Sequence, residues 1–222
     1  MTKSLLLFRP ETLPELLPLF PLPGVILLPR RRLPLSIFEP RYIAMVEDAL
    51  AGQRIIGMIQ PTGLKPIDAP PLYRVGGAGR ITAFEETPDG RFVITLTGLC
   101  RFAVVSESPE QRGYRCAVPD WSSFQDDFEQ ESDVVGLDRP RLISSLRVYF
   151  REQGMAANWE AIEETPDEPL ISCLAMICPF DAGEKQALLE APSMVERFQL
   201  LLALLEMAVA SRSDRRVSVV RH

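Results

Sequence analysis

The chain contains few residues that could transfer a proton near neutral pH. Its only histidine is His222, the last residue, and its lysines are Lys3, Lys65 and Lys185. A Ser–His or Cys–His pair needs a histidine held firmly in a folded element, whereas chain ends are usually poorly ordered. The residue types therefore argue against nucleophilic catalysis with a histidine base.

Cysteines and carboxylates are more numerous, but their spacing does not form a site. The four cysteines stand singly in apolar sequence, without the paired C-x-x-C spacing of a zinc site, so we expect buried, reduced thiols. The acidic pairs Glu85–Glu86 and Glu163–Glu164 are sequence neighbours, which point apart on a regular element instead of converging on one atom. We predict no catalytic residue, no cofactor and no metal site.

Nucleotide binding lacks its sequence context as well. Gly76, Gly77 and Gly79 form a glycine-rich run, but β-type residues follow it where a phosphate-binding loop requires a helix. The pattern G-x-x-x-x-G-K-[S/T] is absent from the sequence. Glycines inside a strand usually mark a bulge or the close approach of another backbone segment, and we predict that role here.

The composition is typical of a soluble globular protein with an acidic balance. The 222 residues are 46% hydrophobic and 24% charged, and the formal net charge is −6. General nucleic-acid binders usually show a basic excess, so the charge argues against nucleic acid as a partner. No stretch approaches the ~18 apolar residues of a membrane span, and no signal-peptide core is present. We expect a cytoplasmic protein that does not bind membranes.

A proline-rich apolar stretch, residues 19–42, organises the fold. Proline has no backbone N–H, so a central strand cannot carry one every few residues. Disordered segments are also rich in proline, but they lack this many Leu, Ile, Val and Phe residues. We therefore predict short extended pieces separated by fixed kinks, with apolar side chains directed inward.

This stretch also carries a family resemblance. Residues 18–25 (Pro-Leu-Phe-Pro-Leu-Pro-Gly-Val) and 33–42 (Leu-Pro-Leu-Ser-Ile-Phe-Glu-Pro-Arg-Tyr) resemble the opening of the N-terminal domain of the ATP-dependent protease Lon. The similarity continues through residues 54–61 and 79–102, and more weakly from Glu184 to the C-terminal helix. The chain thus looks like a Lon N-terminal domain occurring as a standalone protein.

The resemblance implies an α+β fold and a binding function. The fold would be a PUA-like twisted β-barrel with one plugging helix, followed by a C-terminal helical bundle. The partners would be unfolded or degron-bearing polypeptides, with a Lon-type protease as a further candidate. The Ser–Lys peptidase and ATPase motifs of Lon belong to other domains and do not occur here, so we expect a non-enzymatic adaptor module. PUA-like barrels elsewhere bind RNA, which is the alternative that the acidic charge opposes.

Local patterns predict the elements that would build this fold. Tyr42, Met45, Val46 and Ala49 share one face of a helix that begins at Pro40 and ends before Gly52. Period-two alternation, continuous apolar runs and the turn Thr87-Pro-Asp-Gly90 predict strands. The predicted strands are 15–20, 33–38, 55–59, 73–85, 91–107 and 114–118. Asp138 can cap a helix, and Thr165-Pro-Asp-Glu168, Asp181-Ala-Gly-Glu184 and Ser193-Met-Val-Glu196 fit or approximate the capping box. These signals predict further helices at 140–153, 166–177, 182–190 and 194–211.

These elements divide the chain into five parts. Residues 120–138 contain seven acids and no base, which suggests a solvated linker. The predicted parts are an N-terminal arm 1–14, the β-barrel subdomain 15–119, an acidic linker 120–137, the helical bundle 138–211 and a tail 212–222.

Several charged residues lie in apolar sequence, where an unpaired charge would cost several kcal/mol. We predict that Glu39 pairs with at least one of Arg41, Arg80 and Arg101 and locks the helix 40–51 against the barrel. Replacing Glu39 by Ala should then lower the melting temperature markedly. The basic turn of Arg30, Arg31 and Arg32 is either a solvated loop or an electrostatic contact for an acidic partner or a phosphate backbone.

A polypeptide-binding surface would require an exposed apolar groove between barrel and bundle. Its candidate lining residues are Leu33, Leu35, Phe38, Tyr42 and Trp159. Each of them is equally compatible with the core, since Leu and aromatic residues at regular spacing are usually buried.

Overall fold

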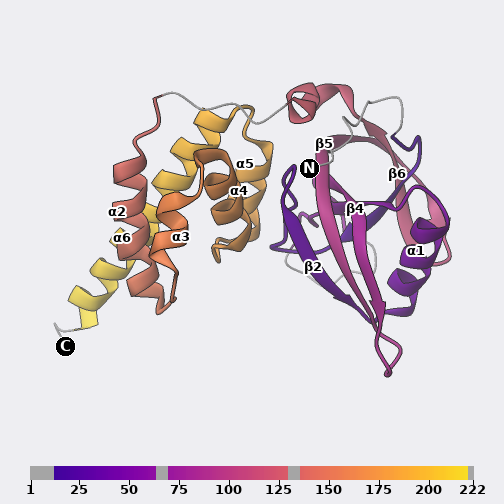
Figure 1. Ribbon diagram of the computed structural model, residues 1–222, viewed down its shortest axis with the longest axis horizontal. Coiled ribbons are helices and arrows are strands. Elements are labelled where there is room, and N and C mark those ends of the chain that lie inside the picture. Colours follow the sequence, from indigo (N-terminus) through magenta and orange to yellow (C-terminus); the bar gives the residue numbers. More distant parts are fainter. Residues whose placement is uncertain (1–12, 64–69, 130–135, 220–222) are drawn as a thin grey trace, which may run out of the picture. The chain divides into compact units, whose positions relative to one another are not determined.

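A computed structural model describes residues 13–63, 70–129 and 136–219 of the chain (Figure 1), with the side chains described as far as Ser211. These residues form two compact units. The strand unit contains residues 13–129 together with Asp181–Leu189, and the helical unit contains residues 136–180 and 190–219. The mixture of a six-stranded sheet with helices agrees with the predicted α+β class.

The six strands lie close to their predicted positions. They are β1 (Leu17–Pro21), β2 (Arg32–Ile37), β3 (Ile55–Ile59), β4 (Val75–Glu86), β5 (Phe92–Gln111) and β6 (Tyr114–Asp120). Their order is β2-β5-β4-β3-β1-β6, and β5 also pairs with β6, which closes five of the strands into a ring. Only β1 and β3 pair in parallel among the described strands. Assignment to the PUA-like type stays a prediction.

The proline-rich stretch behaves as predicted, because its apolar residues enter the core. Ile26, Leu27 and Leu28 are at most 2% exposed, although they lie outside any strand. This segment crosses the sheet so closely that a Cβ atom on Gly77 would lie 1.9 Å from the Leu27 carbonyl oxygen. Only glycine fits there, so the close backbone approach predicted for the glycine run is confirmed.

The helix α1 (Pro40–Ala51) has the predicted bounds and covers part of the ring. Tyr42, Met45, Val46 and Ala49 are buried on its inner face, and the Tyr42 ring lies 4.4 Å from the ring of Phe20 in β1. The helix contacts β1 and β6, on the side of the strand unit shown at the right of Figure 1. The helix α1 therefore packs against these two strands. Its predicted role as a plug at one end of a barrel stays a prediction.

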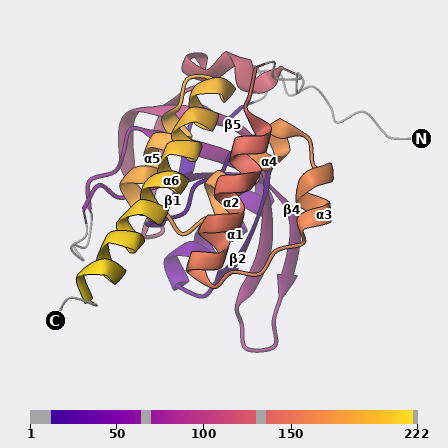
Figure 2. The ribbon, with the colours of Figure 1, turned by 90° about the vertical axis from the view of Figure 1, so that its left-hand side faces the viewer.

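The helical unit contains four α-helices. They are α2 (Arg139–Gln153), α3 (Trp159–Glu164), α4 (Asp167–Ile177) and α6 (Met194–Val219). Both α2 and α4 pack against α6, as the two views in Figures 1 and 2 show. Two of these helices differ from the prediction. The sequence analysis missed α3, and α6 continues through Val219, into the predicted tail.

Capping explains most of the helix boundaries. Asp138 accepts a bond from the Arg141 N–H at the start of α2, and Gly154 ends that helix in the left-handed region with φ of 67°. Reciprocal capping boxes are formed by Asp181 with Glu184 and by Ser193 with Glu196. The predicted box at Thr165 is wrong, because the Thr165 hydroxyl donates backward to the Ala161 carbonyl at the end of α3.

The helix α5 (Ala182–Glu190) corrects the predicted domain boundaries, because it clusters with the strands and not with the bundle. Buried amides bond it to the strand unit. The Gln60 side chain donates to the Ala182 carbonyl at 2.9 Å and to Gln186, and Gln186 donates to the Val75 carbonyl at 3.0 Å. These partners lie more than 100 residues apart in the chain, so no local sequence pattern could predict the bonds between them.

The predicted acidic linker is also partly structured. Residues Ser122–Phe128 form a 3-10 helix, η2, in the strand unit, and the Trp121 indole donates to the Pro14 carbonyl at 3.2 Å. The boundary between the units therefore falls after residue 129, about ten residues later than the prediction of 119. Residues 130–135 of the linker and residues 1–12 of the predicted arm lie outside the described residues.

Candidate functional site

Arg101, on β5, is a buried charge of the strand unit with several bonding partners. Its side chain pairs with Asp127 of η2 at 2.8 Å, and the two side chains are only 5% and 8% exposed. The Asp127 carboxylate also accepts the Arg101 backbone N–H at 2.7 Å, while the guanidinium donates to the Leu189 carbonyl at 3.1 Å. Phe124 stacks on the guanidinium at 4.3 Å. One side chain thus binds β5, η2 and the end of α5 together.

Arg101 has a counter-ion, as predicted for a charge in apolar sequence, but the counter-ion is Asp127 and not Glu39. Glu39 pairs with Arg41 at 2.8 Å, which confirms the predicted pairing with one of the three arginines. The expected burial of this pair is wrong, since the two side chains are 43% and 47% exposed. Because the residues are only two positions apart, the pair does not connect α1 to a strand, and exposed pairs contribute at most about 1 kcal/mol.

Arg80 lies on β4 and is partly buried. Burial, with a smaller contribution from the neighbouring Arg54, lowers the pKa of the Arg80 guanidinium. Partial burial and the one neighbouring like charge both disfavour the charged form of this guanidinium.

The basic turn has mixed roles. The Arg30 guanidinium donates to the main-chain carbonyls of Asp127 and Glu129, so it helps to hold the end of η2. Arg31 donates to the Pro29 carbonyl, and Arg32 is exposed at the start of β2. The three side chains therefore do not act as one free basic cluster.

Four of the five predicted polypeptide-binding residues lie in the strand unit, and the fifth, Trp159, lies in the helical unit. Leu33 and Leu35 are half-buried on β2, and Tyr42 is buried beneath the Arg41 guanidinium, which lies 4.6 Å from its ring. Trp159 belongs to the helical unit, where it packs against Phe150. Among the five, Phe38 is the residue with a strongly exposed side chain, at 64%.

A second exposed aromatic residue, Phe84, lies on the β4–β5 hairpin, whereas Phe38 follows β2, on the other side of β5 from β4. Ile37, the residue before Phe38, lies opposite Phe92 in the β2–β5 register, and the Phe92 ring contacts the Phe84 ring at 4.9 Å. Phe84 is 43% exposed, and Val93, on the other face of β5, is 39% exposed. We call Phe38, Phe84 and Val93 the hairpin patch.

The strand pairing explains why these residues are exposed. Within the described strands, β3 pairs with β4 only as far as Arg80, so the remainder of β4 has β5 as its one neighbour. The outer edge of β2 is likewise unpaired among these strands. The hairpin consequently projects beyond the rest of the strand unit, at the bottom of Figure 1. The exposure of Phe84 and Val93 was not predicted from the sequence, although the Thr87–Gly90 turn predicted the hairpin that carries them.

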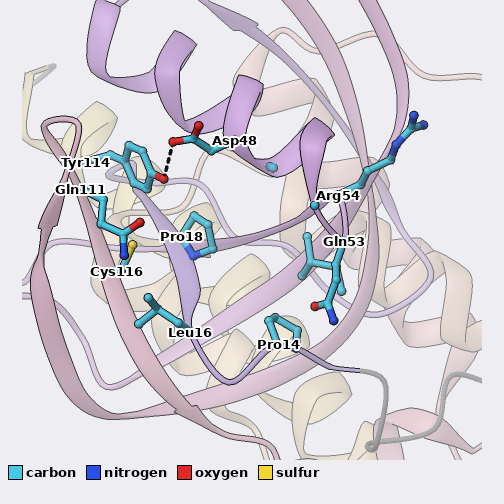
Figure 3. Close-up of a pocket in the computed structure, with 12 residues that line it drawn as sticks. Pro14, Leu16, Pro18, Asp48, Gln53, Arg54, Gln111, Tyr114 and Cys116 are labelled. Atoms are coloured by element: carbon cyan, nitrogen blue, oxygen red, sulfur yellow. Dashed lines mark hydrogen bonds between the residues drawn. The ribbon is translucent and has the colours of Figure 1, made fainter.

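A separate hollow lies beside the C-terminal end of α1 (Figure 3), with a volume of about 230 Å³. Pro14, Leu16 and Pro18 form one wall, and the Tyr114 hydroxyl donates to the Asp48 carboxylate at 2.8 Å on another. Asp48 also pairs with Arg112 at 2.6 Å. The carboxylate in this hollow therefore already has two donors.

The titratable groups in this hollow are poor catalysts. Burial, supplemented by the Asp48 carboxylate, raises the pKa of the Tyr114 hydroxyl. The same two causes raise the pKa of the Cys116 thiol. Both groups are protonated near neutral pH, so neither a thiolate nor a phenolate is available there.

No group of three or more His, Cys, Asp or Glu side chains in the described part of the chain could hold a metal ion. None of the described helices is sufficiently long and apolar to cross a membrane.

Comparisons with known proteins place the whole arrangement in a family. The model of the ATP-dependent protease La (LON) substrate-binding domain matches residues 16–207. The chain is 28% identical over 205 residues to Lon protease 2 of Myxococcus xanthus and 29% identical over 205 residues to Lon protease of Anaeromyxobacter dehalogenans. Each match covers 90% of this chain but 24% of the relative, so the chain spans about a quarter of their length.

Solved structures show the same fold. A Lon N-terminal domain protein from Xanthomonas campestris matches 85% of this chain and 97% of its own, with 24% identity and a TM-score of 0.60. The N-terminal domain of Mycobacterium avium complex Lon protease matches 86% of this chain and 98% of its own, with 13% identity and a TM-score of 0.55. The matched region corresponds to one domain of the relatives. The chain belongs to the family of the Lon substrate-binding domain.

Proposed function

We propose that this chain binds unfolded or degron-bearing polypeptides through the hairpin patch, without catalysing a reaction on them. The observation that carries the proposal is the exposure of Phe84 and Val93 on the projecting hairpin and of Phe38 at the end of the neighbouring β2. Exposed apolar surface is costly for a protein to maintain, and contiguous examples commonly mark interaction sites. Membership of a substrate-binding-domain family supports the same assignment.

The chemistry of the patch suits a flexible ligand. Aromatic side chains dominate binding energetics because they bury a large area with few rotatable bonds. The patch presents few polar groups that would demand a defined ligand sequence, which fits the recognition of apolar segments in unfolded chains. Folded proteins bury such segments, so the patch would bind unfolded polypeptides in preference to folded ones.

The direct test is binding of a fluorescently labelled, permanently unfolded polypeptide such as casein, followed by anisotropy. Removing two half-exposed phenyl rings should cost about 1 kcal/mol each, so the variant F38S/F84S should bind about thirtyfold more weakly. The matched control is V105S/V118S, which removes two other exposed side chains, 63% and 42% exposed, from the same unit.

The control should retain wild-type affinity, and far-UV circular dichroism should show that both variants are folded. Equal loss of binding in the two variants, or no loss in either, would refute the hairpin patch as the binding surface.

An adaptor role and the RNA alternative need their own measurements. We propose that a bound polypeptide is passed to a Lon-type protease, so that adding the chain would accelerate degradation of an unfolded substrate by that protease and F38S/F84S would not. No observation favours RNA. Binding of single-stranded RNA with a steep salt dependence, unaffected by F38S/F84S, would replace the polypeptide assignment.

A further inference from the structure

We propose that the hollow beside the C-terminal end of α1 is a second peptide-binding site, which holds one bulky neutral side chain of a polypeptide, such as that of phenylalanine. The site lies outside the hairpin patch, because the two share no residue. Three features of the hollow carry the assignment, namely its walls, its volume and two glutamine side chains on its lining.

The strand registers place the lining side chains on one surface. Leu16 and Pro18 are two positions apart at the start of β1, and Tyr114 and Cys116 are two positions apart on β6, so each pair shares a face. Pro18 lies opposite Cys116 in the β1–β6 register, and Gln111 lies opposite Tyr114 in the β5–β6 register. These side chains therefore face the same hollow and not opposite sides of the sheet (Figure 3).

The volume of the hollow suits a single side chain. Pockets that bind drug-sized molecules usually measure about 300–1,000 Å³, whereas an apolar cavity of about 150 Å³ already holds a benzene molecule. The hollow measures about 230 Å³ and lies between these sizes. A phenyl ring with its adjoining main chain would fill it.

The lining favours a neutral side chain. The Asp48 carboxylate accepts the Tyr114 hydroxyl at 2.8 Å and pairs with Arg112 at 2.6 Å, so its charge is already compensated. The Arg54 guanidinium points away from the hollow in Figure 3. A lysine or glutamate side chain would lose hydration in the hollow without gaining a counter-ion.

Two glutamine side chains can bind the main chain of the same ligand. Gln53 follows α1, Gln111 ends β5, and both are exposed on the lining of the hollow. Across the residues that the structure describes, neither side chain forms a hydrogen bond. Each amide offers donors and an acceptor, which match the N–H and C=O groups of an extended peptide. The hollow is thus complementary to a side chain together with its main chain.

The experiment is an NMR titration of the nitrogen-15-labelled chain with the blocked peptide Gly-Gly-Phe-Gly-Gly. The side-chain amide resonances of Gln53 and Gln111 and the backbone amide of Cys116 should shift. Replacing the phenylalanine by alanine should weaken binding about tenfold or more, because most of the buried apolar area is lost. Peptides with lysine or glutamate at that position should bind no better than the alanine peptide. Benzyl alcohol, which has the ring without the main chain, should bind more weakly than the phenylalanine peptide.

The variant Q53A/Q111A should bind the phenylalanine peptide about fivefold more weakly, because two hydrogen bonds are lost. Both glutamines are exposed, so the substitutions should not unfold the chain. The matched control Q125A/Q199A removes two exposed glutamines from η2 and α6, and it should bind as the wild type does.

Two further variants test the location of the site. L16W places a larger side chain on one wall of the hollow, and it should abolish binding while circular dichroism shows that the variant is folded. F38S/F84S alters the hairpin patch alone and should bind the peptide as the wild type does.

The outcomes separate this site from the hairpin patch. Absence of the shifts, or equal affinity for the phenylalanine and alanine peptides, would overturn the proposal while leaving polypeptide binding at the hairpin patch intact. Equal affinity for benzyl alcohol and the phenylalanine peptide would overturn recognition of a peptide main chain. Dimerisation that light scattering detects and L16W abolishes would assign the hollow to a second copy of the chain and overturn the polypeptide assignment.

Discussion

Replacing Arg101 by Met should destabilise the strand unit severely, because the substitution leaves a buried carboxylate without its counter-ion. Asp127 is 8% exposed and would keep the bond from the backbone N–H of residue 101, but it would lose the guanidinium that lies 2.8 Å away. The Leu189 carbonyl at the end of α5 would lose a donor as well. Breaking a buried pair in this way costs about 3–5 kcal/mol.

The cost corresponds to a large thermal shift. For a chain of this size each kcal/mol lowers the melting temperature by about 2–4 °C, so R101M should melt about 6–20 °C lower. The variant D127N should be affected in the same direction, because the arginine charge is then left buried. The double variant R101M/D127N removes both charges, and it should be about 2 kcal/mol more stable than the sum of the single effects predicts.

A single tryptophan can report on the relevant unit. Trp121 lies 5.9 Å from Phe102, the residue after Arg101, and the chain's other tryptophan, Trp159, belongs to the helical unit. Urea unfolding in a W159F background, followed by Trp121 fluorescence, therefore measures the environment of the Arg101–Asp127 pair.

The matched control is R112M, which removes an arginine that also binds two carboxylates but is 52% exposed. This variant should lose far less stability than R101M, because exposed ion pairs are well solvated. If R101M and R112M shifted the free energy of unfolding equally, the reasoning from burial would be refuted. Additivity of R101M and D127N in the double variant would show that the two residues do not depend on each other.

Three further predictions follow from contacts elsewhere. The variant E39A should lower the melting temperature by less than about 4 °C, as differential scanning calorimetry would show, because its ion pair is exposed; a larger drop would restore the locking role that the sequence suggested. G77A should cost more than about 3 kcal/mol in urea unfolding, since a main-chain oxygen lies 1.9 Å from its Cβ position, whereas G63A has open space and should be neutral. Thiol labelling of the native protein at pH 8 should modify Cys173 first, as it is exposed while burial raises the pKa of Cys116, and rapid labelling of Cys116 would contradict the described packing.

The sequence by itself determined the local elements and most of their ends. The helix at Pro40 to Ala51 and the capping box of Asp181 with Glu184 were correctly predicted because their signals act within one or two turns of the chain. The scarcity of proton-transferring side chains was also readable from composition, and the resemblance in residues 18–42 identified the family that the comparisons confirm.

Only the tertiary structure decided which distant residues meet and which remain exposed. Arg101 had to find a counter-ion, but the choice of Asp127, 26 residues later, depends on where η2 packs against β5. In the same way, α5 was predicted to belong to the helical bundle, but the structure places it in the strand unit. Its bond to Gln60, more than 100 residues away in the chain, cannot be predicted from a local pattern. From its sequence Phe38 was compatible with a binding groove or with the core, and in the structure it is 64% exposed at the end of β2, whose outer edge has no neighbour among the described strands. Local patterns fix which face of an element is apolar, whereas the long-range pairing of strands determines whether anything covers that face.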